Sequence, residues 1–358
     1  MNDATQQIDI RAVLARLVVG ERLAESESSC LFETLLSGGL DDAQIGAILA
    51  IIQGRGATVD ELVGAARAMR RHVTPVPYKA EPGEVVIDTC GTGGATKTFN
   101  ISTASALVLA AVNPDAVQGS GWSISRVVVA KHGNRSRTGR GSAEVLAGLG
   151  VNIEASPEVQ AKCLREIGVC FSFAMLHHPA MRHAAGPRRS LGFPTIFNLL
   201  GPLTNPAGAK RQLLGVYDAV FVEPMAEVLA RLGSISAVVI HGSGGLDEVS
   251  SLGPSRAVWV RDGKFERADI DPKSVIDGAP PIEALRAQDL DHGVRIIRDV
   301  LAGSAGPQRD IVVLNVAAAL MVAGVAADIE RGAQAAIDAI DSGRAERVLL
   351  DLIELSGP

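Results

Sequence analysis

The sequence predicts an α/β protein in which a small, all-helical N-terminal domain precedes a larger α/β domain with a mostly parallel central sheet. Two observations lead to this prediction. From Ile8 to about Arg71 the apolar residues recur at helical spacing, and no alternating strand pattern is present. Beyond a proline-rich segment, short β-branched runs alternate with helical stretches, which is the pattern of parallel strands joined by helices.

Capping residues predict where helices of the N-terminal part begin. Asp41 with Gln44, and Thr58 with Glu61, have the spacing of a capping box. The segment VTPVPYKAEPGE then supplies three prolines and a glycine, which indicates a linker. We therefore expect the helical domain to end near this segment.

Strands and helices of the second part follow in chain order. The expected strands are GEVVIDTC, RVVVAKHG, LLGVYD, SAVVIHG and AVWVRDG. The expected helices are STASALVLAA, SAEVLAGLG, one opened by Ser156 and Pro157, one near EPMAEVLARLG, and a closing pair from about Asp310. No repeat or low-complexity segment interrupts this pattern.

Composition and charge favour a small-molecule partner. The 358 residues carry a formal net charge of −6 with scattered basic residues, so we expect no nucleic-acid binding. The four cysteines form neither a C-x-x-C pair nor a dense framework, which favours reduced thiols in the cytoplasm: Cys30, Cys90, Cys163 and Cys170. The N-terminus lacks a basic region followed by an apolar core, and no apolar run is long enough to span a membrane.

The loop CGTGGATKTFNIST is the first candidate for the site, because ligands of open α/β sheets bind beyond the carboxyl ends of the strands. Its glycines let the backbone approach an anion closely, and polar residues follow at a helix start: Gly91, Gly93, Gly94, Asn100, Ser102 and Thr103. These residues favour a phosphate cradle, and a tight turn without a ligand is the alternative. The loop is not a dinucleotide-binding fingerprint, because Thr96 occupies the position where G-x-G-x-x-G requires its third glycine.

Two further loops extend this chemistry. The second, AKHGNRSRTGRGSAE, is dense in anion-binding groups, namely Lys131, His132, Asn134, Arg135, Arg137 and Arg140. The third, HGSGGLDEVS, places Asp247 beside Glu248, as oxygen ligands of Mg²⁺ would be, although such a pair alone is more often solvated. Together the three loops imply a polyphosphate-bearing substrate with bound magnesium.

The motifs GTGG, TFNIST, VAKHGNRS, HHPAMR, TIFNLLGPLTNPA and HGSGGLDEVS, in this order and at these intervals, resemble the anthranilate phosphoribosyltransferase family from roughly Asp41 to Ala323. The resemblance implies transfer of the phosphoribosyl group of phosphoribosyl pyrophosphate to the amine of anthranilate in tryptophan biosynthesis, with Mg²⁺ required. It also implies a homodimer of the nucleoside phosphorylase/phosphoribosyltransferase type. The implied domains are residues 1–76, with helices from about 178–198 packing on them, and residues 84–176 with 200–358, with the site in the cleft between them.

The resemblance implies roles for individual residues. Phosphoribosyl pyrophosphate would contact Gly91, Thr92, Gly93, Gly94, Thr98, Asn100, Ser102, Thr103, Lys131, Thr138 and Arg140. Anthranilate would contact Gly91, His132, Asn134, His178 and Arg188, and Mg²⁺ would contact Asp247, Glu248 and Ser102. The planar guanidinium of Arg188 suits the anthranilate carboxylate, with a surface arginine as the alternative. No residue is expected to act as an acid or base, because the transfer mainly needs charge neutralisation and positioning.

The chain departs from the family at three places. In the first loop, ATK replaces a longer segment that contains an aspartate, and we expect Lys97 or Thr96 to fill that space. In the second loop, TGRG replaces a serine-rich segment, so Thr138 or Arg140 would take over the phosphate contact. Residues 113–126 are an insertion, which we interpret as a surface loop, with an oligomer contact through its tryptophan as the alternative.

Two other functions remain as hypotheses. A pyrimidine nucleoside phosphorylase-like enzyme would also place a glycine-rich loop after a strand, but such enzymes lack the KHGN and DE signatures. A nucleic-acid-binding relative without activity is disfavoured by the acidic pI and by the intact acidic pair of Asp247 and Glu248.

The histidines of HHPAMRH suggest a metal site, yet no acidic or cysteine ligand accompanies them, and their spacing fits no zinc signature.

Overall fold

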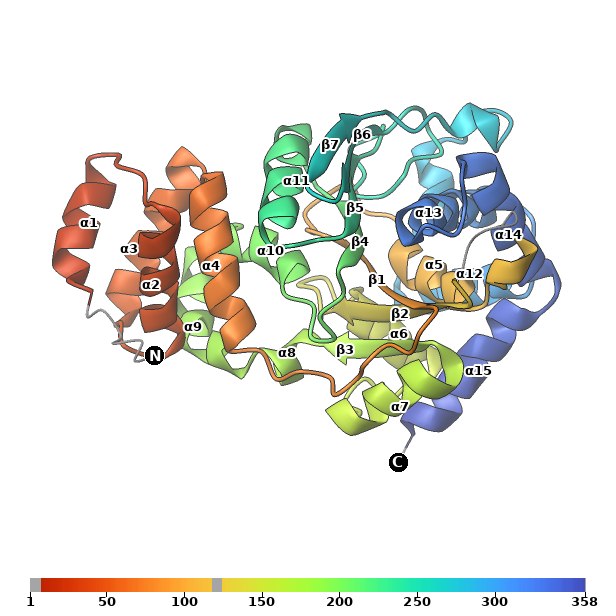
Figure 1. Ribbon diagram of the computed structural model, residues 1–358, viewed down its shortest axis with the longest axis horizontal. Helices are drawn as coiled ribbons and strands as arrows, with labels where there is room; N and C mark the ends of the chain where they lie inside the picture. The colour runs from red at the N-terminus through yellow and green to blue at the C-terminus, as the bar shows by residue number, and fades with distance from the viewer. Residues whose placement is uncertain (1–7, 118–123, 358) are drawn as a thin grey trace.

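The computed structural model describes residues 8–117 and 124–357, which form a helical lobe and a larger α/β lobe (Figure 1). The first helices of the helical lobe are α1 (Ile10–Val18), α2 (Glu25–Leu36), α3 (Asp42–Arg55) and α4 (Val59–Arg71). Two helices from the middle of the chain complete it, because α9 (Arg182–Leu191) packs on α2 and α3, and α10 (Ile196–Leu200) packs on α3 and α4.

Both predicted capping boxes are present. The Asp41 carboxylate accepts a hydrogen bond from the N–H of Gln44 at 2.8 Å, and the Gln44 side chain accepts one from the N–H of Asp41 at 3.0 Å. Thr58 and Glu61 make the equivalent pair at 3.2 and 2.9 Å. These bonds satisfy N–H groups that the first turn of a helix leaves without partners.

The α/β lobe is built on one seven-stranded sheet in the order β3-β2-β1-β4-β5-β6-β7. The strands are β1 (Glu84–Gly91), β2 (Arg126–Gly133), β3 (Val169–Phe173), β4 (Arg211–Gly215), β5 (Ser236–His241), β6 (Arg256–Arg261) and β7 (Lys264–Arg267). Strands β3, β2, β1, β4 and β5 are parallel, and β6 and β7 add to the edge in antiparallel pairs. The prediction of a helical domain and a mostly parallel α/β domain is confirmed.

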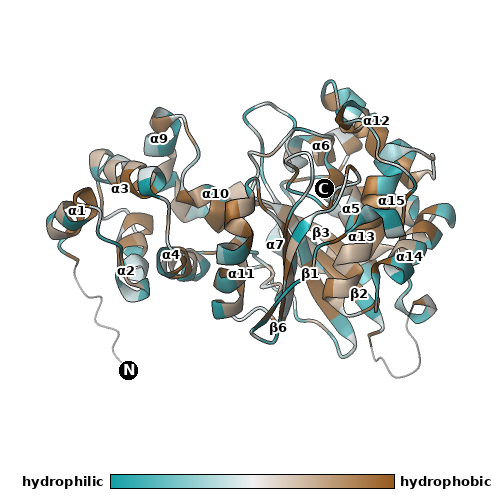
Figure 2. Cartoon of the chain, turned by 90° about the horizontal axis from the view of Figure 1, so that it is seen from above, coloured by the Kyte–Doolittle hydropathy of each residue, from teal (hydrophilic) through white to brown (hydrophobic). Residues whose placement is uncertain are grey.

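Helices flank the sheet on both faces, as the views in Figures 1 and 2 show. They are α5 (Ile101–Ala110), α6 (Ser142–Leu149), α7 (Pro157–Ile167), α8 (Ala174–His177), α11 (Val222–Arg231), α12 (Leu290–Leu301), α13 (Pro307–Ala323), α14 (Ile329–Asp341) and α15 (Arg344–Ser356). Helix α11 packs on β5 and β6 and also on α4, so it joins the two lobes. Helices α11 and α13, which pack on the sheet, carry hydrophobic residues drawn brown in Figure 2.

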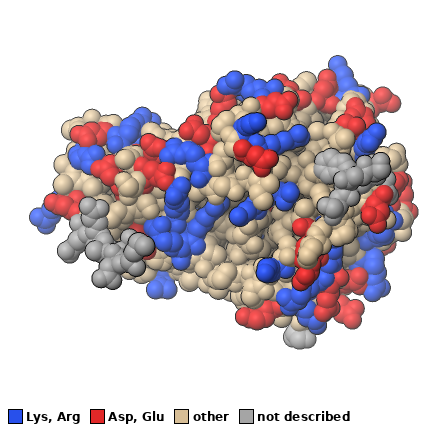
Figure 3. Space-filling model, in the orientation of Figure 1, with Lys and Arg blue, Asp and Glu red and all other residues tan. Residues whose placement is uncertain are grey.

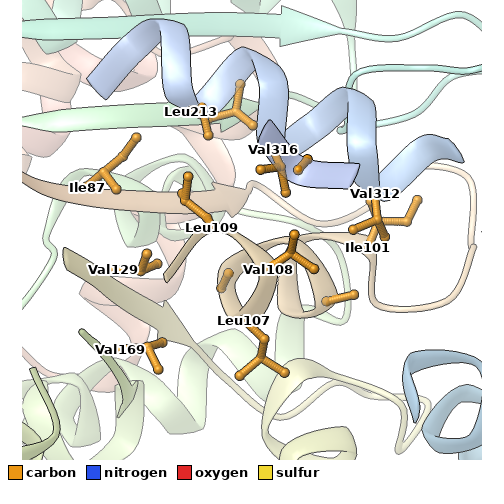
Figure 4. Packing of buried hydrophobic residues seen from close by; sticks show 14 of the residues in the cluster. Ile87, Ile101, Leu107, Val108, Leu109, Val129, Val169, Leu213, Val312 and Val316 are labelled. Atoms are coloured by element: carbon orange, nitrogen blue, oxygen red, sulfur yellow. The ribbon is translucent and has the colours of Figure 1, made fainter. Parts of the chain in front are cut away.

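The core under the strand ends is apolar and close-packed. Side chains of the sheet meet those of α5 and α13 (Figure 4), and the labelled ones are all buried: Ile87, Ile101, Leu107, Val108, Leu109, Val129, Val169, Leu213, Val312 and Val316. Because such interiors have few voids, this core gives the loops beyond the strands a rigid support.

Several parts of the architecture differ from the sequence prediction, which also omitted strand β7 and helix α12. Strand β3 was not predicted, because its five residues, VCFSF, are too short to show a pattern apart from the preceding helix. Three helices rather than a pair close the chain, beginning at Pro307. Only Ser342 and Gly343 separate α14 from α15, and the positive φ of Gly343, 76°, makes the turn between two helical patterns that otherwise run together.

The insertion of residues 113–126 begins with a 3₁₀ turn, Pro114–Ala116, and its positions 118–123, which include Trp122, lie outside the described residues. Other 3₁₀ turns are Pro179–Met181, Gly201–Leu203, Ala219–Phe221, Pro272–Ser274 and Ile282–Leu285. Within residues 8–117 and 124–357, no helix has the length and apolar character to cross a membrane.

Candidate active site

The first and third loops meet beyond the carboxyl ends of β1 and β4. Gly91 ends β1 and pairs with Gly215 at the end of β4, and both glycines lie against Asp247. A Cβ added to Gly91 would lie 2.3 Å from Asp247 Oδ2, and one added to Gly215 would lie 1.7 Å from the Asp247 carbonyl oxygen. Glycine is therefore needed at both positions by close approach, since ordinary contacts begin near 3.4 Å.

Backbone N–H groups of the first loop hold the acidic pair. The N–H of Gly93 donates to Asp247 Oδ2 at 3.1 Å, and the N–H of Ser102, in the first turn of α5, donates to Glu248 Oε1 at 3.1 Å. Burial raises the pKa of both carboxyl groups, and the charge of Asp247 raises the pKa of Glu248 further. The positive charge near the two carboxylates is therefore not enough to balance both of them. A divalent cation that prefers oxygen ligands fits this set of donors.

Lys131, at the end of β2, is the cation next to this pair. It is only 4% exposed, and its Nζ donates to the Thr89 carbonyl at 2.9 Å and to Ser102 Oγ at 3.2 Å. Burial lowers the pKa of Lys131, and the nearby carboxylates of Asp88 and Glu248 oppose that shift. Lys131 therefore stands between the acidic pair and the start of α5, where an anion would meet its charge.

The remaining polar residues of the first loop mostly bond to the protein itself. Thr92 Oγ1 accepts from the N–H of Tyr217 at 3.1 Å, Thr98 Oγ1 donates to the Phe99 carbonyl at 2.9 Å, and Asn100 Nδ2 donates to the Arg140 carbonyl at 3.3 Å. Thr103 Oγ1 is buried without a hydrogen-bond partner among the described residues. Gly93 and Gly94 have positive φ of 66° and 88°, a conformation that favours glycine at both positions of this turn.

The second loop contacts both neighbouring parts of the molecule. The guanidinium of Arg140 donates to the carbonyls of Ala287 and Gln288 at 2.8 and 3.0 Å, so this side chain braces the segment before α12. Thr138 is exposed, and its Oγ1 lies 3.2 Å from Ser136 Oγ.

Arg137 crosses from this loop to the helical lobe. Its guanidinium donates to the carbonyl of Gly192, directly after α9, at 2.9 Å. The second loop therefore spans the two lobes at the candidate site.

Two histidines, one at the end of β2 and one directly after α8, form a buried pair. The Nε2 atoms of His132 and His178 lie 3.2 Å apart, so one ring donates a proton and the other accepts it. Burial lowers the pKa of His178 to about 4 and that of His132 well below its ordinary value, with the charge of His178 as the second cause for His132. Both rings are therefore neutral at pH 7.

Arg188 and Asn134 are the other predicted anthranilate contacts. Arg188 is half-buried, and its guanidinium carbon lies 5.1 Å from the centre of the Phe197 ring, within cation–π distance. Burial lowers its pKa, and it forms no ion pair with any described residue. Asn134 is exposed, and its Oδ1 accepts from the N–H of Arg135 at 2.8 Å.

A buried hydrogen-bond network under the site was not predicted from the sequence. Asp88, fully buried in β1, accepts from the N–H of His132 at 3.3 Å and from Gln212 Nε2 at 3.5 Å. An acidic residue inside an apolar strand indicated Asp88 in the sequence, but no motif indicated Gln212 in β4.

His177, next to His178, bonds to the Thr74 carbonyl at 2.7 Å and thereby ties α8 to the linker.

Comparison with known proteins first defines a class. The family described as "Glycosyl transferase family, a/b domain" matches residues 83–346, and the one described as "Glycosyl transferase family, helical bundle domain" matches residues 11–73. The fold and the anion-binding loops fit this class of glycosyltransferases.

Full-length relatives narrow the class. An anthranilate phosphoribosyltransferase of Rubrobacter xylanophilus is 45% identical over 97% of both chains, and one of Syntrophotalea carbinolica is 43% identical over 98% of this chain and 100% of the relative. The crystal structure of anthranilate phosphoribosyltransferase from Thermus thermophilus has a TM-score of 0.86 at 36% identity, covering 98% of this chain and 99% of that chain. The chain belongs to the anthranilate phosphoribosyltransferase family, which confirms the resemblance seen in its motifs.

Proposed function

We propose that this protein transfers the 5-phosphoribosyl group of phosphoribosyl pyrophosphate to the amine of anthranilate, giving N-(5-phosphoribosyl)anthranilate and pyrophosphate in tryptophan biosynthesis. The observation that carries the proposal is the half-buried pair Asp247 and Glu248, held by N–H groups of the glycine-rich loop and of α5 beside Lys131. Family membership over nearly the full length supports the same activity.

The chemistry places the charge requirement at the leaving group. The bond between the ribose C1 and the pyrophosphate oxygen breaks, the bond between C1 and the anthranilate nitrogen forms, and the amine releases one proton. As C1 becomes cationic, negative charge collects on pyrophosphate, so stabilising that charge and positioning the amine lower the barrier. The neutral His132 and His178 then serve as binding groups rather than as a required base.

The phosphoribosyl pyrophosphate end of the site lies between the first and second loops in this proposal. Gly93 and Gly94 have the positive φ that glycine-rich anion-binding turns use, and the buried ammonium of Lys131 supplies charge. The unpartnered Oγ1 of Thr103 supplies a further polar group. Arg140 supports the loop through its bonds to Ala287 and Gln288, so we propose an indirect role for it.

Mg²⁺ is the metal of the proposed reaction, and Asp247 and Glu248 would hold it. When bound there, Mg²⁺ would neutralise charge on the pyrophosphate. Glu248 also fixes the first turn of α5 through the N–H of Ser102, while Ser102 Oγ accepts from Lys131. The structure of anthranilate phosphoribosyltransferase from Saccharomyces cerevisiae in complex with PRPP and Mg has the same fold, with a TM-score of 0.84 at 23% identity.

Anthranilate would lie in the cleft between the lobes, with Arg188 from the helical lobe binding its carboxylate. Arg188 is suited to this role because its guanidinium is half-buried, stacked on Phe197 and without an ion-pair partner among the described residues. The neighbouring His132 and His178 would contact the ring and the amine.

We further propose a cytoplasmic homodimer. Val18 and Val19, at the end of α1, are 72% and 76% exposed and provide apolar surface for a second copy. Cys90, Cys163 and Cys170 are free thiols, which suits a reducing compartment. Mass measurement in solution tests the dimer, and a monomer at micromolar concentration would overturn it.

The activity is tested directly by fluorescence. When purified protein is mixed with phosphoribosyl pyrophosphate, Mg²⁺ and anthranilate, the fluorescence of anthranilate should fall. One pyrophosphate should be released for each anthranilate that reacts. Reactions without Mg²⁺, or with nucleoside and phosphate in place of both substrates, are the controls. Unchanged anthranilate fluorescence at saturating substrates would refute the proposal.

A further inference from the structure

A cavity of about 370 Å³ lies at the hinge between the lobes, beside the start of β4. It is lined by the end of α4, by the linker at Val73 and Pro75, by residues 202–212, and by the turn after α11. Two of the three chain segments that cross between the lobes, the linker after α4 and the segment before β4, therefore border it. Gln212, near the start of β4, lines this cavity, whereas Gly215, at the end of the same strand, contacts Asp247.

Two cations without acidic partners border the cavity. Arg70 and Lys210 both line it, and neither forms an ion pair within the part of the chain that the structure describes. The guanidinium of Arg70 donates to the carbonyls of Leu203 and Leu232 at 2.7 and 3.1 Å, which fixes it across the hinge. Figure 3 shows basic side chains gathered beside the waist between the lobes, on the face toward the viewer.

The rest of the lining is mainly apolar with one buried amide. Val73, Pro75, Leu203 and Leu232 contribute hydrocarbon surface, while Gln212 is 5% exposed and its Nε2 donates to the Pro202 carbonyl at 2.6 Å. A volume of about 370 Å³ lies within the range of sites that bury small molecules. Because two cationic side chains border an otherwise mainly apolar cavity, the cavity suits a small ligand that has one anionic group and an apolar body.

We propose that this hinge cavity is a second ligand site, which binds a small carboxylate with an apolar body. The carboxylate lies between Arg70 and Lys210, and the apolar body packs on the leucines and prolines. Because both lobes contribute to the lining, a bound ligand favours one arrangement of the lobes over others. This site is independent of the transfer reaction proposed above.

The test measures binding of phenylacetate by calorimetry in a buffer without other carboxylates. The wild-type protein should show saturable binding, and Lys210→Met should raise the dissociation constant about tenfold, which corresponds to about 1.4 kcal/mol. Arg70→Met should weaken binding likewise, but Arg70 also joins the lobes, so the exposed Lys210 gives the cleaner variant. Benzyl alcohol, which lacks the carboxylate, should bind more weakly than phenylacetate.

Two control variants separate the hinge from other sites. Lys162→Met removes an exposed lysine of α7 that does not line the cavity, and it should leave phenylacetate binding unchanged. Arg188→Met should also leave it unchanged, because Arg188 belongs to the candidate active site. Absence of saturation with millimolar phenylacetate, equal binding by Lys210→Met, or loss of binding in Arg188→Met would each overturn the proposal.

Discussion

Substitution of Gly91 by alanine tests the contact between the first and third loops. The added Cβ would lie 2.3 Å from Asp247 Oδ2, and ordinary contacts begin near 3.4 Å, so the carboxylate must move by about 1 Å. Asp247 has little freedom to move, because its carbonyl packs on Gly215 and its Oδ2 accepts from the N–H of Gly93. The substitution therefore displaces one of the two carboxylates proposed to bind Mg²⁺.

The expected effect of Gly91→Ala is a fall in kcat/KM of about 100-fold, or about 2.7 kcal/mol, since an error of about 1 Å in positioning has this cost. The Mg²⁺ concentration for half-maximal activity should also rise. Both are measured from anthranilate fluorescence, with thermal unfolding as the check that the variant is folded. Gly54→Ala is the control, since its Cβ meets nothing within 4 Å and alanine suits the interior of α3.

A variant Gly91→Ala with unchanged kcat/KM and unchanged Mg²⁺ dependence would refute the contact and the metal assignment built on it. A fall in activity with no change in Mg²⁺ dependence would separate the two, because it would leave the contact in place and remove the metal from Asp247.

Three further predictions follow from the site. Replacing Asp247 and Glu248 together by alanine should remove the response of the residual activity to Mg²⁺, and a retained response would contradict their assignment. Arg188→Lys should raise the KM for anthranilate about tenfold with a smaller change in kcat, because an ammonium cannot pair with a carboxylate in bidentate fashion; an unchanged KM would place the carboxylate elsewhere. Because the pKa of His178 falls from 6.5 to about 4 on folding, the unfolded state binds the proton first as pH falls below 6.5. This group should therefore lower the free energy of unfolding by about 2 kcal/mol between pH 7 and pH 5; urea unfolding measures it, and His178→Gln should lose that part of the dependence.

The helix starts and the chemistry of the loops could be predicted from the sequence because both depend on local residues. The capping box of Asp41 and Gln44 needs only residues three positions apart. Likewise, the glycines after β1 indicated a close approach to an anion or a side chain whatever the rest of the fold.

Contacts between distant segments could not be predicted in this way. The guanidinium of Arg140 bonds to the carbonyls of Ala287 and Gln288, which no local pattern connects with it, while its expected phosphate contact stays a prediction. The bond between Gln212 and Asp88 depends on β4 lying next to β1, a neighbour relation that the chain order does not specify.

The first loop is fastened to the third loop at Thr96, one of the two residues expected to fill the space of an acidic residue there. Thr96 donates through its N–H to the Gly245 carbonyl and through its Oγ1 to the Gly244 carbonyl, each at 2.9 Å. Neutral hydrogen bonds therefore fasten the first loop to the loop that carries Asp247, while Lys97 is exposed. Because Thr96 adds no negative charge, Asp247 and Glu248 are the carboxylates that the first loop contacts here, and burial raises the pKa of both, which favours the proposed binding of a cation between them.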